Sequence, residues 1–436
     1  MSLRSSRTWG TIANMHSEKE KSFLQKLGPG FITGCSDDDP SGIGTFAQTG
    51  AIFGYAQLWL MVFTVPFMIA VQEMCGRIGL TTGKGLSGVI RKHYSRKLLC
   101  VAVVLLLVAN TVNIGADLGA MAAAAQLLIP IPFAALVLVM TVVTLLLEIF
   151  VTYQTYVSYL KYLTLSLFGY FLVAFTVRQD WGAIAYATFI PTITFSNVYL
   201  MNIVAVLGTS ISPYLFFWQA GEEVEEEVAH GKLHAMGVGT PKITNSDIKT
   251  MRVDTAVGMG FSNLVTYFII MTTASTLHRN GIFDIQTAAD AAEALRPIAG
   301  NFAYVLFTLG IIGTGLLAVP VLAGSASYAV AEAFQWREGL YLKLERAHGF
   351  YGVITIATLI GLLVNFTPIS PFAMLYYTAV LNGIIAPPLL VIILLIGNNR
   401  KIMGERVNGR LGNFFGIVIT AVMAVAGVAV IYSFWR

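Results

Sequence analysis

The sequence predicts an all-α polytopic membrane protein in which eleven helices cross the bilayer and helices 1 and 6 are broken. Composition is the first observation: 56% of the 436 residues are hydrophobic and 11% are charged, whereas a soluble domain carries roughly 25% charged residues. Apolar stretches of spanning length recur along the whole chain, and basic residues lie mainly on one side of them. The lipid bilayer is therefore the expected surrounding. A soluble enzyme, a nucleic-acid-binding protein and a disordered scaffold are all disfavoured.

Residues 1–30 are polar, and we expect them to form a cytoplasmic tail because they contain basic residues and no apolar core. A spanning helix needs about 20 mostly apolar residues. The predicted helices are 31–55, 57–76, 98–125, 133–152, 156–177, 197–220, 255–278, 301–333, 350–366, 371–396 and 412–435. Transmembrane strands would alternate polar and apolar residues instead, and no stretch does so.

The distribution of basic residues predicts the orientation. With the N-terminus inside, inner segments hold 23 of the 27 Lys and Arg residues and outer segments hold four. Cytoplasmic loops are enriched in Lys and Arg. We therefore expect a cytoplasmic N-terminus and an outside C-terminus, in a prokaryotic cell membrane.

Two predicted helices contain breaks, SDDDPSG at 36–42 and GTSISP at 208–213. Proline removes a backbone donor and glycine loosens a helix, so each break frees polar groups that lipid cannot satisfy. The breaks lie five helices apart, which makes 31–177 and 197–396 equivalent, inverted repeats and 412–435 an additional helix. Paired breaks of this kind indicate a midplane substrate site in a secondary transporter. Two ordinary proline kinks are the alternative.

Three consecutive carboxylates, Asp37, Asp38 and Asp39, accompany the first break. A charge near the bilayer centre costs roughly 2.5–3.5 kcal/mol, and the nearest basic residues, Lys26 and Arg77, lie outside the apolar spans. A cation is therefore the expected partner. Steps of about 100° per residue spread the three side chains too widely to bind one ion together, so we expect one to face an aqueous vestibule. Solvated charge at a wet helix end is the alternative, chiefly for Asp37 and Asp38.

Four runs carry a resemblance to a known family. GPGFITGCSDDDPSGIGTFAQTGAIFGYAQLW at 28–59 and QEMCGRIGLTTGKGL at 72–86 closely resemble the first two helices of the natural resistance-associated macrophage protein (Nramp) family of divalent-metal transporters. GADLG in helix 3 and LGTSISPYLFFWQ in helix 6 match later landmarks in the same order. The resemblance, which spans roughly 28–396, implies the inverted-repeat fold of the bacterial leucine transporter. It also implies a metal site between the two broken helices.

The resemblance implies a ligand set as well. The family's Asp-Pro-Gly-Asn in helix 1 reads DPSG at 39–42 here, and its Met-Pro-His in helix 6 reads SPY at 212–214. Asp39 keeps the ion-binding carboxylate, Gly42 replaces the ligating asparagine, Ser212 replaces the methionine, and Thr209 would supply a backbone carbonyl. The full set of candidate metal-site residues is Asp39, Gly42, Thr209, Ser212, Ser41, Ser210, Asp38, Tyr214 and Asp117.

The departures from the family pattern change the expected cation. A thioether favours transition metals, and its loss leaves oxygen ligands that suit hard cations. Gly42 opens space, and Mg²⁺ prefers to keep several waters. The combination looks like the magnesium-transporting branch related to the family, so we expect Mg²⁺ and Mn²⁺ as substrates and no cofactor. A proton-coupled Mn²⁺/Fe²⁺ carrier of the ordinary Nramp type and a sodium-coupled amino-acid carrier are the transporter alternatives.

Proton coupling is not expected. The family's two helix 6 histidines are Tyr214 and Gln219 here, and Ala120 replaces a helix 3 glutamate. The six histidines all lie outside the interiors of the predicted spans, so the usual proton carrier at physiological pH is missing there. Asp117 matches an acidic residue of the family's proton pathway, and a buried aspartate bonded to a neighbouring helix explains it equally well. An intramembrane aspartyl enzyme using Asp39 and Asp117, and a non-transporting sensor, are the other classes considered.

The segment EEVEEEVAHGKLH at 222–234 contains five glutamates and two histidines. Charge runs of this kind are typical of solvated faces. We therefore expect a solvated face, with a regulatory cation site as the alternative.

Overall fold

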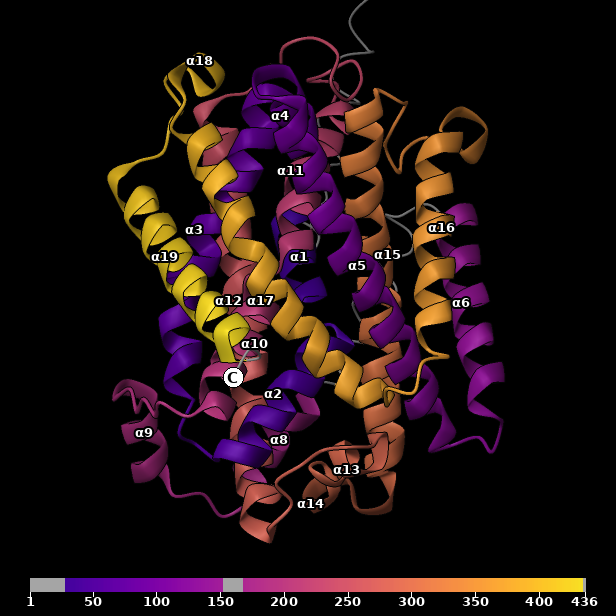
Figure 1. Ribbon diagram of the computed structural model, residues 1–436, viewed down its shortest axis with the longest axis vertical. Helices are drawn as coiled ribbons and strands as arrows, with labels where there is room; N and C mark the ends of the chain where they lie inside the picture. Colours follow the sequence, from indigo (N-terminus) through magenta and orange to yellow (C-terminus); the bar gives the residue numbers. More distant parts are fainter. Residues whose placement is uncertain (1–27, 152–167, 434–436) are drawn as a thin grey trace, which may run out of the picture.

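The structure, a computed structural model, describes residues 28–151 and 168–433 and is a bundle of long helices (Figure 1). Eight described helices are long and apolar enough to cross a membrane, when a broken pair at Asn197–Ala229 is taken as one, and His348–Val364 is a shorter apolar helix. These helices are consistent with the eleven predicted. The predicted all-α polytopic class is confirmed. Nearly all of the predicted tail, and most of the predicted helix 156–177, lie outside the described residues.

The helices follow the predicted order along the chain. The first half contains α1 (Pro29–Asp37), α2 (Pro40–Phe53), α3 (Trp59–Thr82), α4 (Leu86–His93), α5 (Arg96–Gln126), α6 (Phe133–Phe150) and α8 (Phe168–Thr176). The second half contains α9 (Trp181–Phe189), α10 (Asn197–Ser210), α11 (Pro213–Ala229), α12 (Asn245–Thr276), α13 (Ala288–Glu293), α14 (Arg296–Ala299), α15 (Ala303–Phe334), α16 (His348–Val364), α17 (Pro371–Gly397), α18 (Arg400–Met403) and α19 (Arg410–Ser433).

Both predicted breaks are present. Helix α1 ends at Asp37 and α2 begins at Pro40, with Asp39 in an extended conformation as the N-cap of α2. Helix α10 ends at Ser210 and α11 begins at Pro213. Each second half-helix starts with proline, whose missing N–H costs nothing in a first turn. The local sequence therefore both ends one half-helix and starts the next.

The bundle has two ends, which we call the α4 end and the α13 end after the helices that lie there (top and bottom of Figure 1). The broken helices occupy the middle of the bundle, and α6, α16 and α19 lie at its flanks (Figure 1). Helix α1 begins at the α4 end, where Gly28 and Pro29 share a cavity wall with the last turns of α11. Helix α10 begins at the α13 end, where Asn197 lines a second cavity. The two broken helices therefore run in opposite directions.

Close glycine contacts fix α1 against α12. A Cβ on Gly34 would lie 2.3 Å from the carbonyl of Gly258, and one on Gly30 would lie 2.6 Å from the backbone nitrogen of Thr255. Small residues of this kind let the backbones of membrane helices approach closely. This contact covers the first half-helix along its length.

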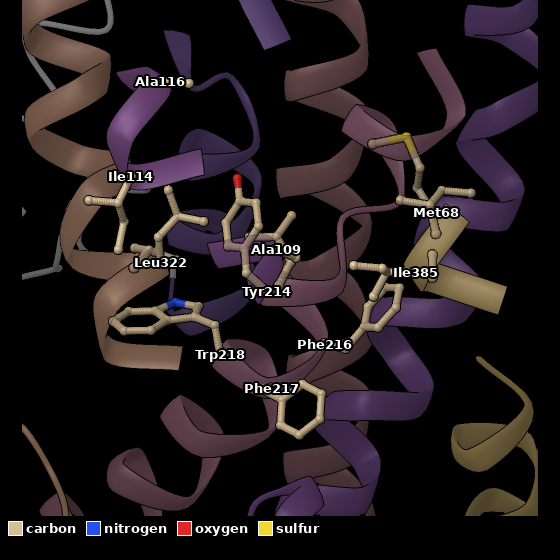
Figure 2. Packing of buried hydrophobic residues seen from close by; sticks show 14 of the residues in the cluster. Met68, Ala109, Ile114, Ala116, Tyr214, Phe216, Phe217, Trp218, Leu322 and Ile385 are labelled. Atoms are coloured by element: carbon tan, nitrogen blue, oxygen red, sulfur yellow. The ribbon is translucent and has the colours of Figure 1, made fainter. Parts of the chain in front are cut away.

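Large side chains fill the space on the α4 side of the second break. Tyr214, Phe216, Phe217 and Trp218 of α11 are buried between neighbouring helices (Figure 2). Figure 2 shows them facing residues such as Met68 of α3 and Leu322 of α15, with Ile385 of α17 beside Phe216. This packing fixes α11 on the α4 side of the break.

The solvated face expected at 222–234 is wrong for the first part of that segment, whereas residues 229–231 are exposed. The segment continues α11 to Ala229, and Glu222, Glu223 and Glu227 are 7%, 4% and 2% exposed. Helix α11 packs here against α3 and α15, which cover the charged turns. Local charge therefore did not predict burial, because the covering helices come from distant parts of the chain.

Candidate metal site

The two breaks meet at Gly42. A Cβ on this glycine would lie 3.2 Å from each of three oxygens, the Asp37 carbonyl, Asp39 Oδ1 and Thr209 Oγ1. These oxygens belong to the end of α1, the link to α2 and the end of α10. Position 42 therefore lies close to a carbonyl, a carboxylate and a hydroxyl oxygen, and a side chain there would crowd all three.

The Asp39 carboxylate is held by donors on two helices. It accepts hydrogen bonds from Gly42 N at 2.6 Å, from Ser41 Oγ at 2.9 Å and from Asn113 Nδ2 at 2.8 Å. Hydrogen bonds to a carboxylate favour its charged form and fix its orientation. Asn113 was not among the candidate metal-site residues, because interhelical hydrogen bonding was an adequate explanation for it from sequence. Its position four residues before Asp117 was the available signal, because such residues share a helix face.

Asp117 lies beside the same cluster. Its carboxylate accepts hydrogen bonds from Ser41 N at 3.2 Å and from Asn113 Nδ2 at 3.4 Å, and the residue is fully buried. The bond to a neighbouring helix is therefore present, while the role in a proton pathway that the family match implied stays an alternative. Asp39 and Asp117 share Asn113 and Ser41, so a change of charge on one would be felt by the other.

The other two carboxylates face α12. Ser262 Oγ lies 3.1 Å from Asp37 Oδ2 and 3.0 Å from Asp38 Oδ1. The expected divergence of the triplet is thus present, because Asp39 turns towards α5. The expected exposure of one carboxylate to an aqueous vestibule is wrong, since all three residues are 2–3% exposed. Helix α12 covers the carboxylates that were expected to face water. Ser262 of this helix is a site residue that the sequence reasoning missed.

The second break satisfies its own carbonyls. Ser212 Oγ donates to the carbonyls of Gly208 at 3.1 Å and Thr209 at 2.8 Å. Thr209 was expected to present its carbonyl to the ion, and in the structure its hydroxyl is the group that lies near Gly42. A carbonyl oxygen has two lone pairs, so the bond from Ser212 leaves one available. Ser210 is buried at the end of α10.

Tyr214 connects the two broken helices. Its hydroxyl donates to the Ser36 carbonyl at 2.9 Å, one of the carbonyls that the end of α1 leaves free. The side chain therefore contributes a bond between α11 and α1 in this structure. Tyr214 occupies the position of the family's first helix 6 histidine, and it is connected to the site through its bond to the Ser36 carbonyl.

Each end of the bundle contains a cavity. A cavity of about 730 Å³ at the α13 end is lined by residues of α2, α10 and α17 and reaches Gly44, two residues beyond Gly42. A cavity of about 340 Å³ at the α4 end is lined at α1 by Gly28 and Pro29, at the far end of this half-helix from the break. Asp39 itself is buried. In residues 28–151 and 168–433, no three His, Cys, Asp or Glu side chains are grouped at metal-ligand spacing, so an ion at Gly42 would rely largely on neutral oxygens.

A membrane bundle with two antiparallel broken helices that meet at a buried carboxylate defines a secondary-transporter architecture. The chain belongs to the family described as natural resistance-associated macrophage protein-like, whose sequence pattern matches residues 30–433. The resemblance seen in the sequence is therefore confirmed at the level of the family. Membership also settles that the chain is a transport protein rather than an intramembrane enzyme.

Individual relatives agree with this assignment. The chain is 24% identical over 420 residues to the divalent metal cation transporter MntH of Caldanaerobacter subterraneus subsp. tengcongensis, covering 94% of each chain. It is 24% identical over 406 residues to MntH of Pectobacterium carotovorum, covering 92% of each.

Solved structures confirm the fold. The Eremococcus coleocola manganese transporter matches with a TM-score of 0.74 at 15% identity, over 93% of this chain and 86% of that one. The nucleobase-cation-symport-1 family transporter Mhp1 matches with a TM-score of 0.58 at 12% identity, over 93% and 90%.

Proposed function

We propose that this protein carries divalent cations across the membrane through the site at Gly42. The convergence of Asp37 O, Asp39 Oδ1 and Thr209 Oγ1 on Gly42 is the observation that carries the proposal. Three oxygens of this kind are ligands for a hard divalent cation. The names of the relatives, a divalent metal cation transporter and a manganese transporter, point to the same class of substrate.

Mg²⁺ and Mn²⁺ are the proposed substrates. The three atoms nearest to a Cβ on Gly42 are all oxygens, and Ser212 stands where the family has a soft sulfur. A site with one close carboxylate and no side chain at position 42 suits a cation that keeps part of its water. Asp39 would be the central ligand, and Ser41 and Asp117 would support it.

The orientation follows from the basic residues. The α4 end carries Arg91, Lys92, Arg400 and Lys401, so we place this end in the cytoplasm of a prokaryotic cell. The two repeat units would be residues 31–177 and 197–396, with α19 outside the repeat. Opposite directions of the two broken helices support that division.

We propose movement of the cation down its own gradient, without protons. Tyr214 donates its hydrogen to the Ser36 carbonyl, and Gln219 donates to Glu223 Oε1 at 2.8 Å. Both family histidine positions are thus occupied by structural donors. An inside-negative potential favours entry by about 2.3 kcal/mol per charge per 100 mV.

One observation favours a second candidate, the ordinary proton-coupled Mn²⁺/Fe²⁺ carrier. Asp117 is buried and shares two donors with Asp39, an arrangement in which proton and metal binding could be linked. The two candidates differ in whether the lumen of a liposome acidifies during metal uptake.

Uptake into proteoliposomes tests the proposal. Purified protein is reconstituted with a Mn²⁺-sensitive dye inside, and external Mn²⁺ is added. We expect saturable uptake that protein-free liposomes lack. Equal rates in both preparations would contradict the proposed function.

A further inference from the structure

A second group of carboxylates surrounds the cavity at the α4 end. The cavity lies between the start of α1, the last turns of α11 and the start of α12. Its volume is about 340 Å³. The charged side chains in its wall are Glu223, Glu226, Glu227, Asp247 and Asp254, with Lys232 and His230 as the basic residues. Acidic groups therefore outnumber basic ones.

Three of these carboxylates already have partners. Asp254 accepts hydrogen bonds from Gly28 N at 2.9 Å and Gly30 N at 2.7 Å, which ties the start of α1 to α12. Asp247 lies 2.7 Å from Lys232 Nζ. Glu226 lies 3.5 Å from His230 Nδ1, and both side chains are exposed. The single lysine of the wall is thus already used by Asp247.

Glu227 differs from the others. It is 2% exposed, it lines the cavity, and neither of its carboxylate oxygens has a hydrogen-bond partner in the described part of the chain. Glu223, one turn earlier, is also buried, and it accepts a bond from Gln219 through Oε1 only. A buried carboxylate without a partner is costly. Glu227 is such a group, and it lies beside the same cavity as Glu223, which has one bonded oxygen; together they favour a bound cation.

We propose that this cavity is a second divalent-cation site, separate from the site at Gly42, in which Glu227 and Glu223 hold the ion. The carboxylate oxygens of Glu227 and Glu223 are ligands that suit a hard cation. A water occupies about 30 Å³ in the liquid, so the cavity accommodates an ion together with its inner waters. Mg²⁺ is bound by one or two carboxylates and several waters in such sites. The lack of a ready-made group of three ligands among the described residues fits this mode.

The position of the site gives it a consequence for transport. Its wall contains the start of α1 and the end of α11, the two half-helices on the α4 side of the breaks. An ion that draws Glu223 and Glu227 together stabilises this arrangement of α11 against α1 and α12. If the α4 end is cytoplasmic, as proposed above, the bound ion reports the internal cation concentration. This last step rests on the proposed function, whereas binding itself does not.

Counting bound Mn²⁺ tests the inference. Purified full-length protein is titrated with Mn²⁺, and the free ion is measured by electron paramagnetic resonance. We expect two Mn²⁺ per chain in the wild type and one in Glu227→Gln, which keeps the size of the side chain and removes its charge. The exposed Glu405 at the same end of the bundle provides the control, because Glu405→Gln changes the net charge equally and should leave two sites.

An Asp39→Asn variant separates the two sites. We expect it to bind one Mn²⁺, at the α4 end, and the double variant with Glu227→Gln to bind none. Retention of the Gly42 site in Glu227→Gln also shows that this variant is folded. The second site would be overturned if Glu227→Gln bound two Mn²⁺ per chain. It would also be overturned if the wild type bound only one Mn²⁺ and Asp39→Asn bound none. Wild-type stoichiometry in Asp39→Asn would instead count against the transport site.

Discussion

Replacement of Gly42 by alanine perturbs the proposed metal site with a single methyl group. That methyl would lie 3.2 Å from the Asp37 carbonyl, Asp39 Oδ1 and Thr209 Oγ1, in the space that the ion and its water would use. Loss of one ligand to a charged partner costs about 1.5–3 kcal/mol, or roughly ten- to a hundredfold in affinity. We therefore expect the KM for Mn²⁺ uptake to rise by that factor.

Two opposing effects act on protein stability, because the methyl also requires three oxygens at 3.2 Å to shift by a few tenths of an ångström. Alanine is the better helix former by about 0.5–1 kcal/mol, and Gly42 lies in the first turns of α2. Gly260→Ala is the matched control, because a Cβ at Gly260 of α12 meets nothing within 4 Å. The assay is dye-based Mn²⁺ uptake in proteoliposomes, with thermal unfolding measured in parallel. An unchanged KM in a stably folded Gly42→Ala protein would refute the assignment of this space to the ion.

Three further predictions concern selectivity, coupling and the contact between the broken helices. The double change Ser212→Met and Gly42→Asn should add a thioether and remove space, so that excess Mg²⁺ competes with Mn²⁺ uptake much less than in the wild type; equal competition in both proteins would contradict this. Mg²⁺ uptake should leave the internal pH unchanged, because Tyr214 and Gln219 replace the titrating histidines. A fall in internal pH in step with uptake, measured with a pH-sensitive dye, would show proton coupling. Tyr214→Phe should lose the bond to the Ser36 carbonyl and destabilise the protein by about 1 kcal/mol in thermal unfolding, whereas an unchanged midpoint would show that this bond contributes nothing.

The breaks were predictable because their causes are local. Proline, glycine and charge within 36–42 and 208–213 end each half-helix by themselves. The odd spacing of the breaks then gives two antiparallel half-helix pairs, which the structure contains. Asp39 could be named for the same reason, since it is the charged residue that caps the second half-helix.

The partners of the site residues were not predictable from local sequence. Ser262 lies more than 200 positions from Asp37 and Asp38, and it reaches them because glycines let α12 approach α1 closely. The burial of Glu227 likewise depends on the packing of α11 against distant helices. These two differences have a tertiary cause. The cause at Thr209 is local: its hydroxyl lies near Gly42, while its carbonyl accepts a bond from Ser212 three residues later.

Direct Mg²⁺ uptake tests the central claim, that Asp39 and its oxygen neighbours form a transport site for hard divalent cations. Wild type and Asp39→Ala are reconstituted at equal density with a Mg²⁺-sensitive dye inside, and equal insertion is checked for both. We expect the wild type to carry Mg²⁺ and Asp39→Ala to carry neither Mg²⁺ nor Mn²⁺. Wild-type flux in Asp39→Ala would contradict the site. The hard-cation claim would be contradicted if the wild type carried Mn²⁺ but not Mg²⁺ and if millimolar Mg²⁺ did not inhibit Mn²⁺ uptake. An ordinary transition-metal carrier would then be the better account.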